Sequence, residues 1–167
     1  MHPPVNWSLW TPQVRANLCF IRKNQQLLLI RKKRGLGAGK VNAPGGKIEP
    51  GETPLDAAIR ETQEEVGVLP LNLSARGILQ FQFLDGYSLY CTVFIATDLI
   101  GTPLETPEAI PFWVPENAVP YSEMWEDDQH WLPQMLQGDF FNGRFTFDRD
   151  QMLSKEIEFL AAFPGNS

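Results

Sequence analysis

The sequence predicts an α+β fold in which helices pack on a mixed β-sheet. Apolar, strand-like segments flank an amphipathic helical pattern at residues 54–66, and a second helical pattern follows at residues 126–136. Groups of strands with helices between and after them are typical of one α+β domain. At 167 residues the chain is long enough for a sizeable core, and we expect a single domain over residues 1–167.

The segment before the first helix is expected to form two strands and several turns. Residues 1–13 contain three prolines and two tryptophans, which favours an irregular arm. Residues 14–21 and 26–32 predict two strands joined by a polar turn. After them we expect a glycine-rich loop at residues 34–39 and a short strand at residues 41–43 that runs into a Pro-Gly-Gly turn.

The first helix has clear boundary signals. Thr53 is a good N-cap, Pro54 suits the first helical position, and Gly67 can supply the left-handed residue that ends a helix. Helical spacing predicts a core-facing apolar stripe made of Leu55, Ile59, Thr62 and Val66. The three glutamates of this helix lie at the edge of that stripe or beyond it.

Beyond this helix the sequence predicts a hairpin, a loop and a second helix. Residues 75–83 and 88–97 form the hairpin, and its strongly apolar second strand should be central in the sheet. Prolines and a glycine predict a loop at residues 100–111. The remaining elements are a brief strand at 112–114, a helix at 126–136 with Pro133 near its start or at a kink, a last strand at 143–148, and a segment at 151–160 that fits a strand or a helix.

Composition limits the classes of function. The chain is 43% hydrophobic and 20% charged, which is ordinary for a globular protein. A net charge of −6 argues against a nucleic-acid-coating surface, so we expect no stable nucleic-acid partner. Cys19 and Cys91 lie in apolar segments and should be buried free thiols. Without a membrane-length apolar run or a signal-peptide pattern, we expect no membrane partner and a cytoplasmic protein, as a monomer with a dimer left open.

Three glutamates on the first helix give the strongest chemical signal. Glu61, Glu64 and Glu65 lie at i, i+3 and i+4 on one side of the helix, where like charges repel unless a cation lies among them. Mg²⁺ binds carboxylates together with substrate phosphates, which predicts a metal-assisted phosphate enzyme. A solvated, glutamate-rich helix face is the alternative. Arg60 is the expected partner of Glu52 and would pin the preceding loop to the helix.

A glycine, an arginine and acidic residues at fixed offsets resemble the signature of the Nudix hydrolases. The matching positions are Gly46, Glu52, Arg60, Glu61, Glu64, Glu65, Gly67 and Val68. Thr62 departs from the pattern, because the family usually has an aliphatic residue there. The resemblance implies the Nudix fold, an α/β/α sandwich in which helices flank a mixed β-sheet.

Further segments resemble the MutT-homologue type of this family, the oxidised purine nucleoside triphosphatases such as 8-oxo-dGTP diphosphatase. These segments are residues 32–39, 101–105, 112–113 and 124–128. The resemblance implies Mg²⁺-dependent conversion of oxidised purine nucleoside triphosphates, such as 8-oxo-dGTP or 2-hydroxy-dATP, to monophosphate and diphosphate, with Mn²⁺ as an alternative ion. Such an activity would clean the nucleotide pool and so serve DNA repair.

The resemblance also implies catalytic and metal-binding roles for single residues. The catalytic group would comprise Glu52, Arg60, Glu61, Glu64 and Glu65. The metal ligands would be Gly46 through its carbonyl, Glu61, Glu64, Glu65 and the later Glu108. Glu64 is a candidate for either a ligand or the catalytic base. For Glu108, exposure to solvent in a proline-rich loop is the alternative.

A purine pocket is implied in the same way. Asn42 would hold the purine edge, Trp125 would stack on it, and Asp127 with Asp128 would read the base. A protonated acid donates a hydrogen bond and its ionised neighbour accepts one, which suits an oxidised purine. The other pocket residues would be Lys32, near the phosphates, and Asn17, Leu36, Phe81 and Phe83.

Each assignment has an alternative. Asp127 and Asp128 also suit a helix cap, Trp125 suits a core aromatic, and Lys32 suits a solvated hairpin end. Leu36 and Asn17 depart from the closest animal members, so hydrolysis is better determined than base preference. Other Nudix substrates are therefore alternatives, namely ADP-ribose, a dinucleotide polyphosphate, a capped RNA end or a methylated purine nucleotide. A nucleotide-binding module without catalysis is a further alternative.

Overall fold

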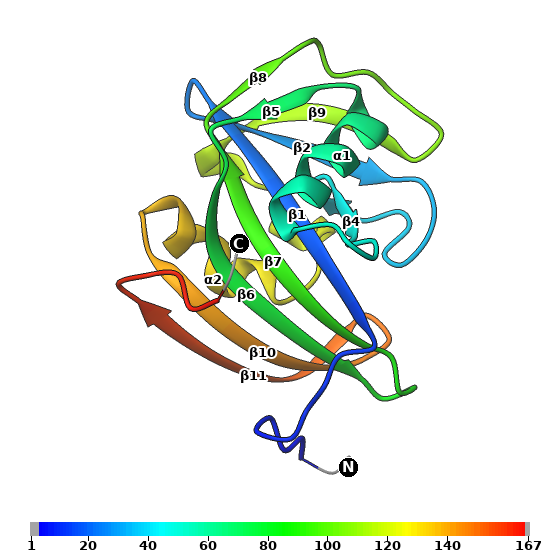
Figure 1. Cartoon of the computed structure of the whole chain (residues 1–167), viewed down its shortest axis with the longest axis vertical. Coiled ribbons are helices and arrows are strands. Elements are labelled where there is room, and N and C mark those ends of the chain that lie inside the picture. Colours follow the sequence, from blue (N-terminus) through cyan, green and yellow to red (C-terminus); the bar gives the residue numbers. More distant parts are fainter. Residues whose placement is uncertain (1–3, 166–167) are drawn as a thin grey trace.

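The computed structural model describes residues 4–165 (Figure 1). It has the predicted strands and helices in the predicted order, with further short strands at residues 45–47, 69–71 and 98–100 that were not predicted. The strands are β1 Val14–Lys23, β2 Gln26–Lys32, β3 Val41–Asn42, β4 Gly45–Lys47, β5 Leu69–Leu71, β6 Ser74–Phe83, β7 Ser88–Ala96, β8 Asp98–Ile100, β9 Ala109–Pro115, β10 Phe140–Asp148 and β11 Gln151–Leu160. The helices are α1 Pro54–Val66 and α2 Asp128–Leu136, with short 3₁₀-helices η1 Glu116–Ala118 and η2 Tyr121–Glu123.

Within residues 4–165, nine strands form one mixed sheet. Its spatial order is β11-β10-β6-β7-β1-β2-β3, with β4 paired to β1 and β9 paired to β2. Strand β1 runs parallel to β7, and β6 runs parallel to β10, whereas the other pairs are antiparallel. Strands β5 and β8 form a separate antiparallel pair. The predicted mixed sheet, with the second hairpin strand (β7) at its centre, is confirmed.

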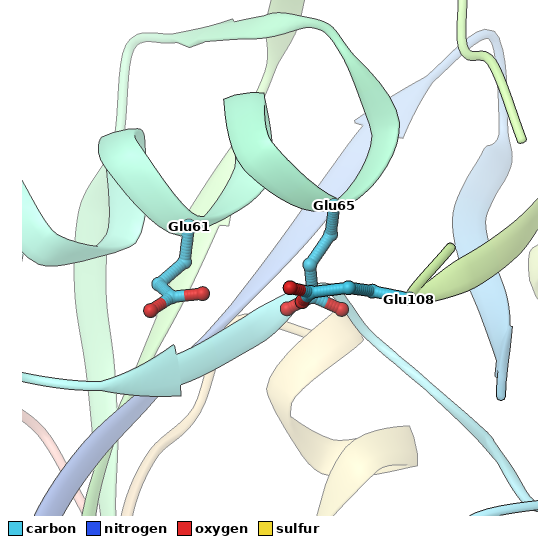
Figure 2. Close-up of side chains that lie close together, drawn as sticks. All are labelled: Glu61, Glu65 and Glu108. Atoms are coloured by element: carbon cyan, nitrogen blue, oxygen red, sulfur yellow. The ribbon is translucent and has the colours of Figure 1, made fainter. Parts of the chain in front are cut away.

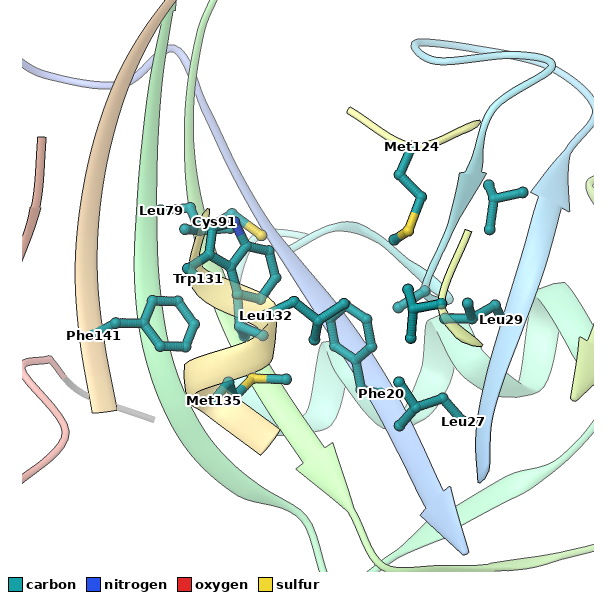
Figure 3. Packing of buried hydrophobic residues seen from close by; sticks show 14 of the residues in the cluster. Phe20, Leu27, Leu29, Leu79, Cys91, Met124, Trp131, Leu132, Met135 and Phe141 are labelled. Carbon is teal, nitrogen blue, oxygen red and sulfur yellow. The ribbon is translucent and has the colours of Figure 1, made fainter. Parts of the chain in front are cut away.

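The central strands are covered on both faces, because their side chains alternate between two cores. One core contains Phe20, Leu27 and Leu29 with Trp131, Leu132 and Met135 of α2 (Figure 3). The other contains Cys19, Ile21, Leu28 and Ile30 with Ala58 and Val66 of α1. Successive side chains of a strand point to opposite faces, so α1 and α2 lie on opposite sides of the sheet. This is the expected α/β/α arrangement.

Helix α1 begins and ends as predicted, but its buried face differs. Thr53 Oγ1 accepts a hydrogen bond from Asp56 N at 3.1 Å, and Gly67 is left-handed with φ 74°. Leu55, predicted for the core, is 37% exposed, and Ile59 is only half-buried. The buried positions are instead Ala57, Ala58, Thr62, Glu65 and Val66. Small alanines allow a helix to approach a sheet closely, and this rotation turns Glu65 inward rather than to the edge of the stripe.

Predictions outside α1 need further corrections. The brief strand predicted at 112–114 is β9, which has seven residues and pairs along β2, so the loop predicted at 100–111 is shorter. Strand β4 lies where a Pro-Gly-Gly turn was predicted, and it pairs with β1. Strand β4 and much of β9 were missed because they contain proline or glycine, which are uncommon in strands. They are defined by backbone pairing rather than by a side-chain pattern. The segment at 151–160, which was left open, is strand β11.

The N-terminal arm and the cysteines agree with the predictions where the structure describes them. Residues 4–13 form turns without a strand or helix before β1, and residues 1–3 of the arm lie outside the described residues. Cys19 and Cys91 are buried free thiols. Among the helices of the described chain, none has the length and apolar character needed to cross a membrane.

Candidate active site

Three carboxylates converge beside strand β4. Glu61 and Glu65 lie one turn apart on α1, and Glu108 comes from the loop before β9 (Figure 2). Oxygens from all three side chains lie within 4.8 Å of one another. Gly46 makes room for them, because a Cβ at this position would lie 2.4 Å from Glu61 Cδ. The structure therefore brings together three of the predicted metal ligands, with Gly46 alongside.

The cluster lies in surroundings that disfavour negative charge. Burial raises the pKa of Glu65 to about 7. A hydrogen bond from Gly45 N to Glu65 Oε1 at 3.0 Å favours the charged form and so opposes this rise in part. Burial is also the main cause of the raised pKa of Glu61, and repulsion from Glu108 adds to both shifts. A cation among the carboxylates would remove this penalty. An all-oxygen donor set suits a hard divalent ion.

Arg60 fastens the loop before α1 to the helix. Its Nε and Nη2 donate to the two carboxylate oxygens of Glu52 at 2.6 and 2.8 Å, so the predicted pair forms in bidentate geometry. The guanidinium holds the pKa of Glu52 down at about 2. Arg60 Nη1 also donates to Glu61 at 2.9 Å and to Glu64 at 3.2 Å. Arg60 therefore orients a carboxylate of the cluster as well as the loop.

Glu64 and Glu108 are placed differently from one another. The Glu64 side chain is 52% exposed and bonded to Arg60, outside the three-carboxylate cluster. Its predicted role as a metal ligand has no support in this arrangement, while its role as a base stays a prediction. Glu108 is half-buried, its backbone O accepts from Lys33 N at 2.9 Å, and its Oε1 accepts from Arg34 Nη2 at 3.2 Å. The Glu108 side chain is 40% exposed, so the predicted exposure to solvent holds in part, but its carboxylate is paired and lies at the acidic cluster.

One pocket adjoins the carboxylates. It is lined by every residue predicted for substrate binding, namely Asn17, Lys32, Leu36, Asn42, Phe81, Phe83, Trp125, Asp127 and Asp128. Glu65 and Gly46 line the same pocket, so it is continuous with the acidic cluster. Lys32 lines the pocket together with Glu65, and its positive charge lowers the pKa of that carboxyl. The pocket therefore has an aromatic and acidic end and a second end at the carboxylate cluster.

Trp125 is held on several sides. Phe83 and Phe147 meet its ring at steep angles, with centroids 6.0 and 5.5 Å away. Lys40 Nζ lies 5.2 Å from the ring centroid, which is a cation–π contact. Gly37 comes so close that a Cβ there would lie 2.9 Å from Trp125 Nε1. Lys40, Phe147 and the close approach of Gly37 to the tryptophan were not predicted from the sequence.

Asp127 and Asp128 are buried in the pocket wall. Asp127 Oδ2 accepts a hydrogen bond from Trp131 Nε1 at 2.9 Å, while Asp127 Oδ1 and Asp128 Oδ2 are buried without a hydrogen-bond partner in the described chain. Burial raises the pKa of both carboxyls, and the Asp127 charge raises that of Asp128 further. Asp127 is the N-cap of α2, but its side chain makes no capping hydrogen bond. The capping alternative therefore holds for position only: Asp127 is the N-cap residue and Asp128 is an acidic residue of the first turn, but the Asp127 side chain does not cap the helix.

The two asparagines of the pocket differ in accessibility. Asn42 Oδ1 accepts a hydrogen bond from Ala43 N at 2.8 Å, which fixes the amide and leaves Nδ2 as the group to meet a ligand. Asn17 is 1% exposed, and both polar atoms of its amide are sealed from solvent without a partner among the described residues. Asn17 therefore belongs to the pocket wall, with an amide that, like Asp127 Oδ1 and Asp128 Oδ2, has no hydrogen-bond partner among the described residues.

The remaining wall residues were assigned to the core or were not singled out. They are Ala16, Leu18, Ile30, Ala43, Gly45, Leu79, Leu89 and Cys91. Most lie on β1, β2, β6 and β7, where an apolar residue looks the same in sequence whether it faces a core or a pocket. The sequence holds no signal that separates these two environments.

Comparisons with known proteins agree with this geometry. The family model described as NUDIX domain matches residues 11–135. The chain is 38% identical over 148 residues to the oxidized purine nucleoside triphosphate hydrolase of Mus musculus, covering 87% of this chain and 95% of that protein, and 42% identical over 131 residues to the Danio rerio protein of that name, covering 78% and 84%. The crystal structure of a MutT protein from Bacillus halodurans matches with a TM-score of 0.78 and 30% identity, over 87% of this chain and 97% of that one. The chain therefore belongs to the Nudix family.

Proposed function

We propose that this Nudix protein hydrolyses oxidised purine nucleoside triphosphates, such as 8-oxo-dGTP or 2-hydroxy-dATP, to monophosphate and diphosphate. One observation carries the proposal: a single pocket is lined by Trp125, Asp127 and Asp128 and also by Glu65 of the acidic cluster. A nucleotide in this pocket would have its base beside the tryptophan and its phosphates beside the carboxylates. The names of the mouse and zebrafish relatives point to the same class of substrate.

The cofactor in this proposal is Mg²⁺, with Mn²⁺ as a substitute, held by Glu61, Glu65 and Glu108. The donor chemistry fits, because three carboxylates offer oxygens within 4.8 Å of one another and Mg²⁺ sites in phosphate enzymes combine carboxylates with substrate phosphates. The backbone carbonyl of Gly46 is a further ligand in the proposal. When bound, such an ion neutralises the charge that develops on the phosphates and acidifies a water molecule.

The chain's own groups prepare the phosphate end. Lys32 lines the pocket near Glu65 and attracts the phosphates by its charge. Glu64 is the proposed base that accepts a proton from the attacking water, and Arg60 holds its carboxylate at 3.2 Å. The bidentate bond between Arg60 and Glu52 keeps the loop at Gly46 fixed against α1.

In the proposal, the part of the pocket beside Trp125 recognises the base. The raised pKa values of Asp127 and Asp128 favour one shared proton at neutral pH, so one carboxyl donates a hydrogen bond and the other accepts one. Oxidation of guanine at C8 converts the N7 acceptor into an N–H donor, which changes the pattern that such a pair meets. Asn42 Nδ2 adds a donor, and stacking on Trp125 contributes about 1–3 kcal/mol whatever the base.

A substrate panel tests the proposal. Purified protein with Mg²⁺ is given 8-oxo-dGTP, 2-hydroxy-dATP, dGTP, ADP-ribose, a dinucleotide polyphosphate and a methylated purine nucleotide, and the products are quantified by chromatography. We expect kcat/KM for an oxidised purine triphosphate to exceed that for dGTP more than about tenfold. A comparable preference for ADP-ribose would replace the substrate assignment, and binding without turnover with any divalent ion would indicate a binding module.

Two substitutions test the assignment of the two ends. Glu65→Gln keeps the shape of a buried side chain in the acidic cluster but removes its charge, so we expect kcat to fall by at least about a hundredfold. Trp125→Ala should mainly raise KM, because it removes the stacking surface. Glu158→Gln, at an exposed position of β11, is the matched control and should leave both constants unchanged.

A further inference from the structure

The loop that carries Glu108 is docked on the C-terminal end of α1. Leu104 N donates to Val66 O at 2.9 Å, and Thr106 Oγ1 donates to Glu65 O at 2.7 Å. Both carbonyls belong to the last turn of the helix, where no intrahelical partner is available for them. The loop therefore caps the helix that provides Glu65 while it presents Glu108 to the same cluster.

Thr106 bridges the backbones of two residues of the acidic cluster. The hydroxyl that donates to Glu65 O also accepts a hydrogen bond from Glu108 N at 3.2 Å. Thr106 N donates to Ala109 O at 3.0 Å, which closes the turn around Glu108. Thr106 is half-buried, so these bonds are partly shielded from competing water. One hydroxyl thus links two carboxylate residues that lie far apart in the sequence.

We propose that Thr106 is a positioning residue for the metal site, whose hydroxyl fixes Glu108 relative to Glu65. The inference rests on the proposed function in one respect, namely that the cluster holds a divalent ion. Without the hydroxyl, the bond from Leu104 N is left to hold this part of the loop to α1, and the Glu108 backbone loses its link to the helix. Groups that hold metal ligands in place typically contribute about ten- to a hundredfold to metal affinity.

Direct binding of Mn²⁺ tests this role without turnover. Free Mn²⁺ is titrated by its electron paramagnetic resonance signal against the wild type, Thr106→Val, Thr106→Ser and Thr102→Val. The valine at 106 keeps the branched shape without the hydroxyl, the serine keeps the hydroxyl, and Thr102 is an exposed residue of the same loop. We expect Thr106→Val to weaken Mn²⁺ binding about tenfold, with the other two variants within about twofold of the wild type.

Repeating the titration in a Glu108→Gln variant separates the positioning of Glu108 from a general loss of protein stability. In Glu108→Gln protein, Thr106→Val should weaken Mn²⁺ binding further by less than about twofold, because the ligand that it positions is already impaired. A full tenfold loss in this background would overturn the role, as would wild-type affinity in Thr106→Val or an equal loss in Thr106→Ser. If circular dichroism shows that Thr106→Val does not fold, Thr106→Ala is judged by the same criteria.

The controls also separate this inference from the proposed function. A wild-type protein that binds no Mn²⁺ and hydrolyses no nucleotide would refute both. A wild-type protein that binds Mn²⁺ and hydrolyses nucleotides, with unchanged Mn²⁺ affinity in Thr106→Val, would refute the positioning role alone.

Discussion

The buried acid pair should make the protein less stable at neutral pH, and Asp127→Asn tests this cost. Burial raises the pKa of Asp127 to about 6, whereas an aspartate in an unfolded chain has a pKa of about 3.9. At 1.36 kcal/mol per pKa unit, this difference of about 2 units corresponds to about 3 kcal/mol when the carboxyl ionises. Because the proton is shared with Asp128, we expect a gain of about 1–3 kcal/mol at pH 7.5. Asparagine can still accept the hydrogen bond from Trp131.

The sign of the pH dependence follows from the direction of the shift. The folded state of the wild type binds the Asp127 proton more tightly than the unfolded state does, so this contribution to stability is complete below pH 4 and is lost as the pH rises through about 6. The advantage of Asp127→Asn should therefore be small at pH 4.5 and full at pH 7.5. Urea unfolding at the two pH values measures it, with exposed Asp139→Asn as the control. The reasoning is refuted if the variant gains nothing at pH 7.5 or gains equally at both pH values.

Other predictions concern the tryptophan, the loop before α1 and the metal. Lys40→Met removes the ammonium group over Trp125 but keeps an apolar side chain. In steady-state assays, KM for purine nucleotides should rise about three- to tenfold with kcat little changed, and Lys40→Arg should restore KM. Gly37→Ala should raise KM more than Gly39→Ala, because both positions have positive φ but only the first Cβ would strike Trp125; equal effects would show that backbone strain alone is responsible. Glu52→Gln should weaken its bidentate bond to the helix and lower kcat about ten- to a hundredfold, as a shift of about 1 Å near reacting groups does. Chelation should abolish turnover and lower the melting temperature, and added Mg²⁺ should restore both; a melting temperature that ignores Mg²⁺ at every concentration would count against a metal site.

The sequence predicted a structural feature correctly where that feature depends only on residues of one helix or strand. Thr53 and Gly67 predicted the ends of α1, because capping and a left-handed C-terminal residue depend on a few neighbouring residues. The predicted burial of Leu55 was wrong, because packing against the sheet decides which side of a helix is covered. Strands β4 and β9 were hidden for a similar reason, since their partners β1 and β2 lie far away in the sequence.

In the candidate site, too, residue spacing predicted which residues share one helix but not which ones the tertiary structure brings together. Helical spacing alone predicted that Glu61 and Glu65 share a face, because both lie on α1. Glu108 entered only through the family resemblance, and Lys40 and Thr106 were not predicted. Each of these three residues acts on a group that the fold brings from another element, as Lys40 does on the Trp125 ring at 5.2 Å. A single sequence holds no local pattern for such pairs, because their spacing is set by the tertiary structure.

Three buried acids break the rules of a stable core at positions where a ligand is proposed. Glu65, Asp127 and Asp128 are each buried, and each has its carboxyl pKa raised by that burial. They lie along one pocket, with the aspartate pair beside Trp125 and Glu65 in the acidic cluster. Natural sequences usually break such rules only where function compensates for the loss of stability. A nucleoside without phosphates would relieve the cost at one end, and diphosphate with a metal ion would relieve it at the other. A nucleotide bound with a divalent ion spans both ends, so it should stabilise the protein more than either fragment does.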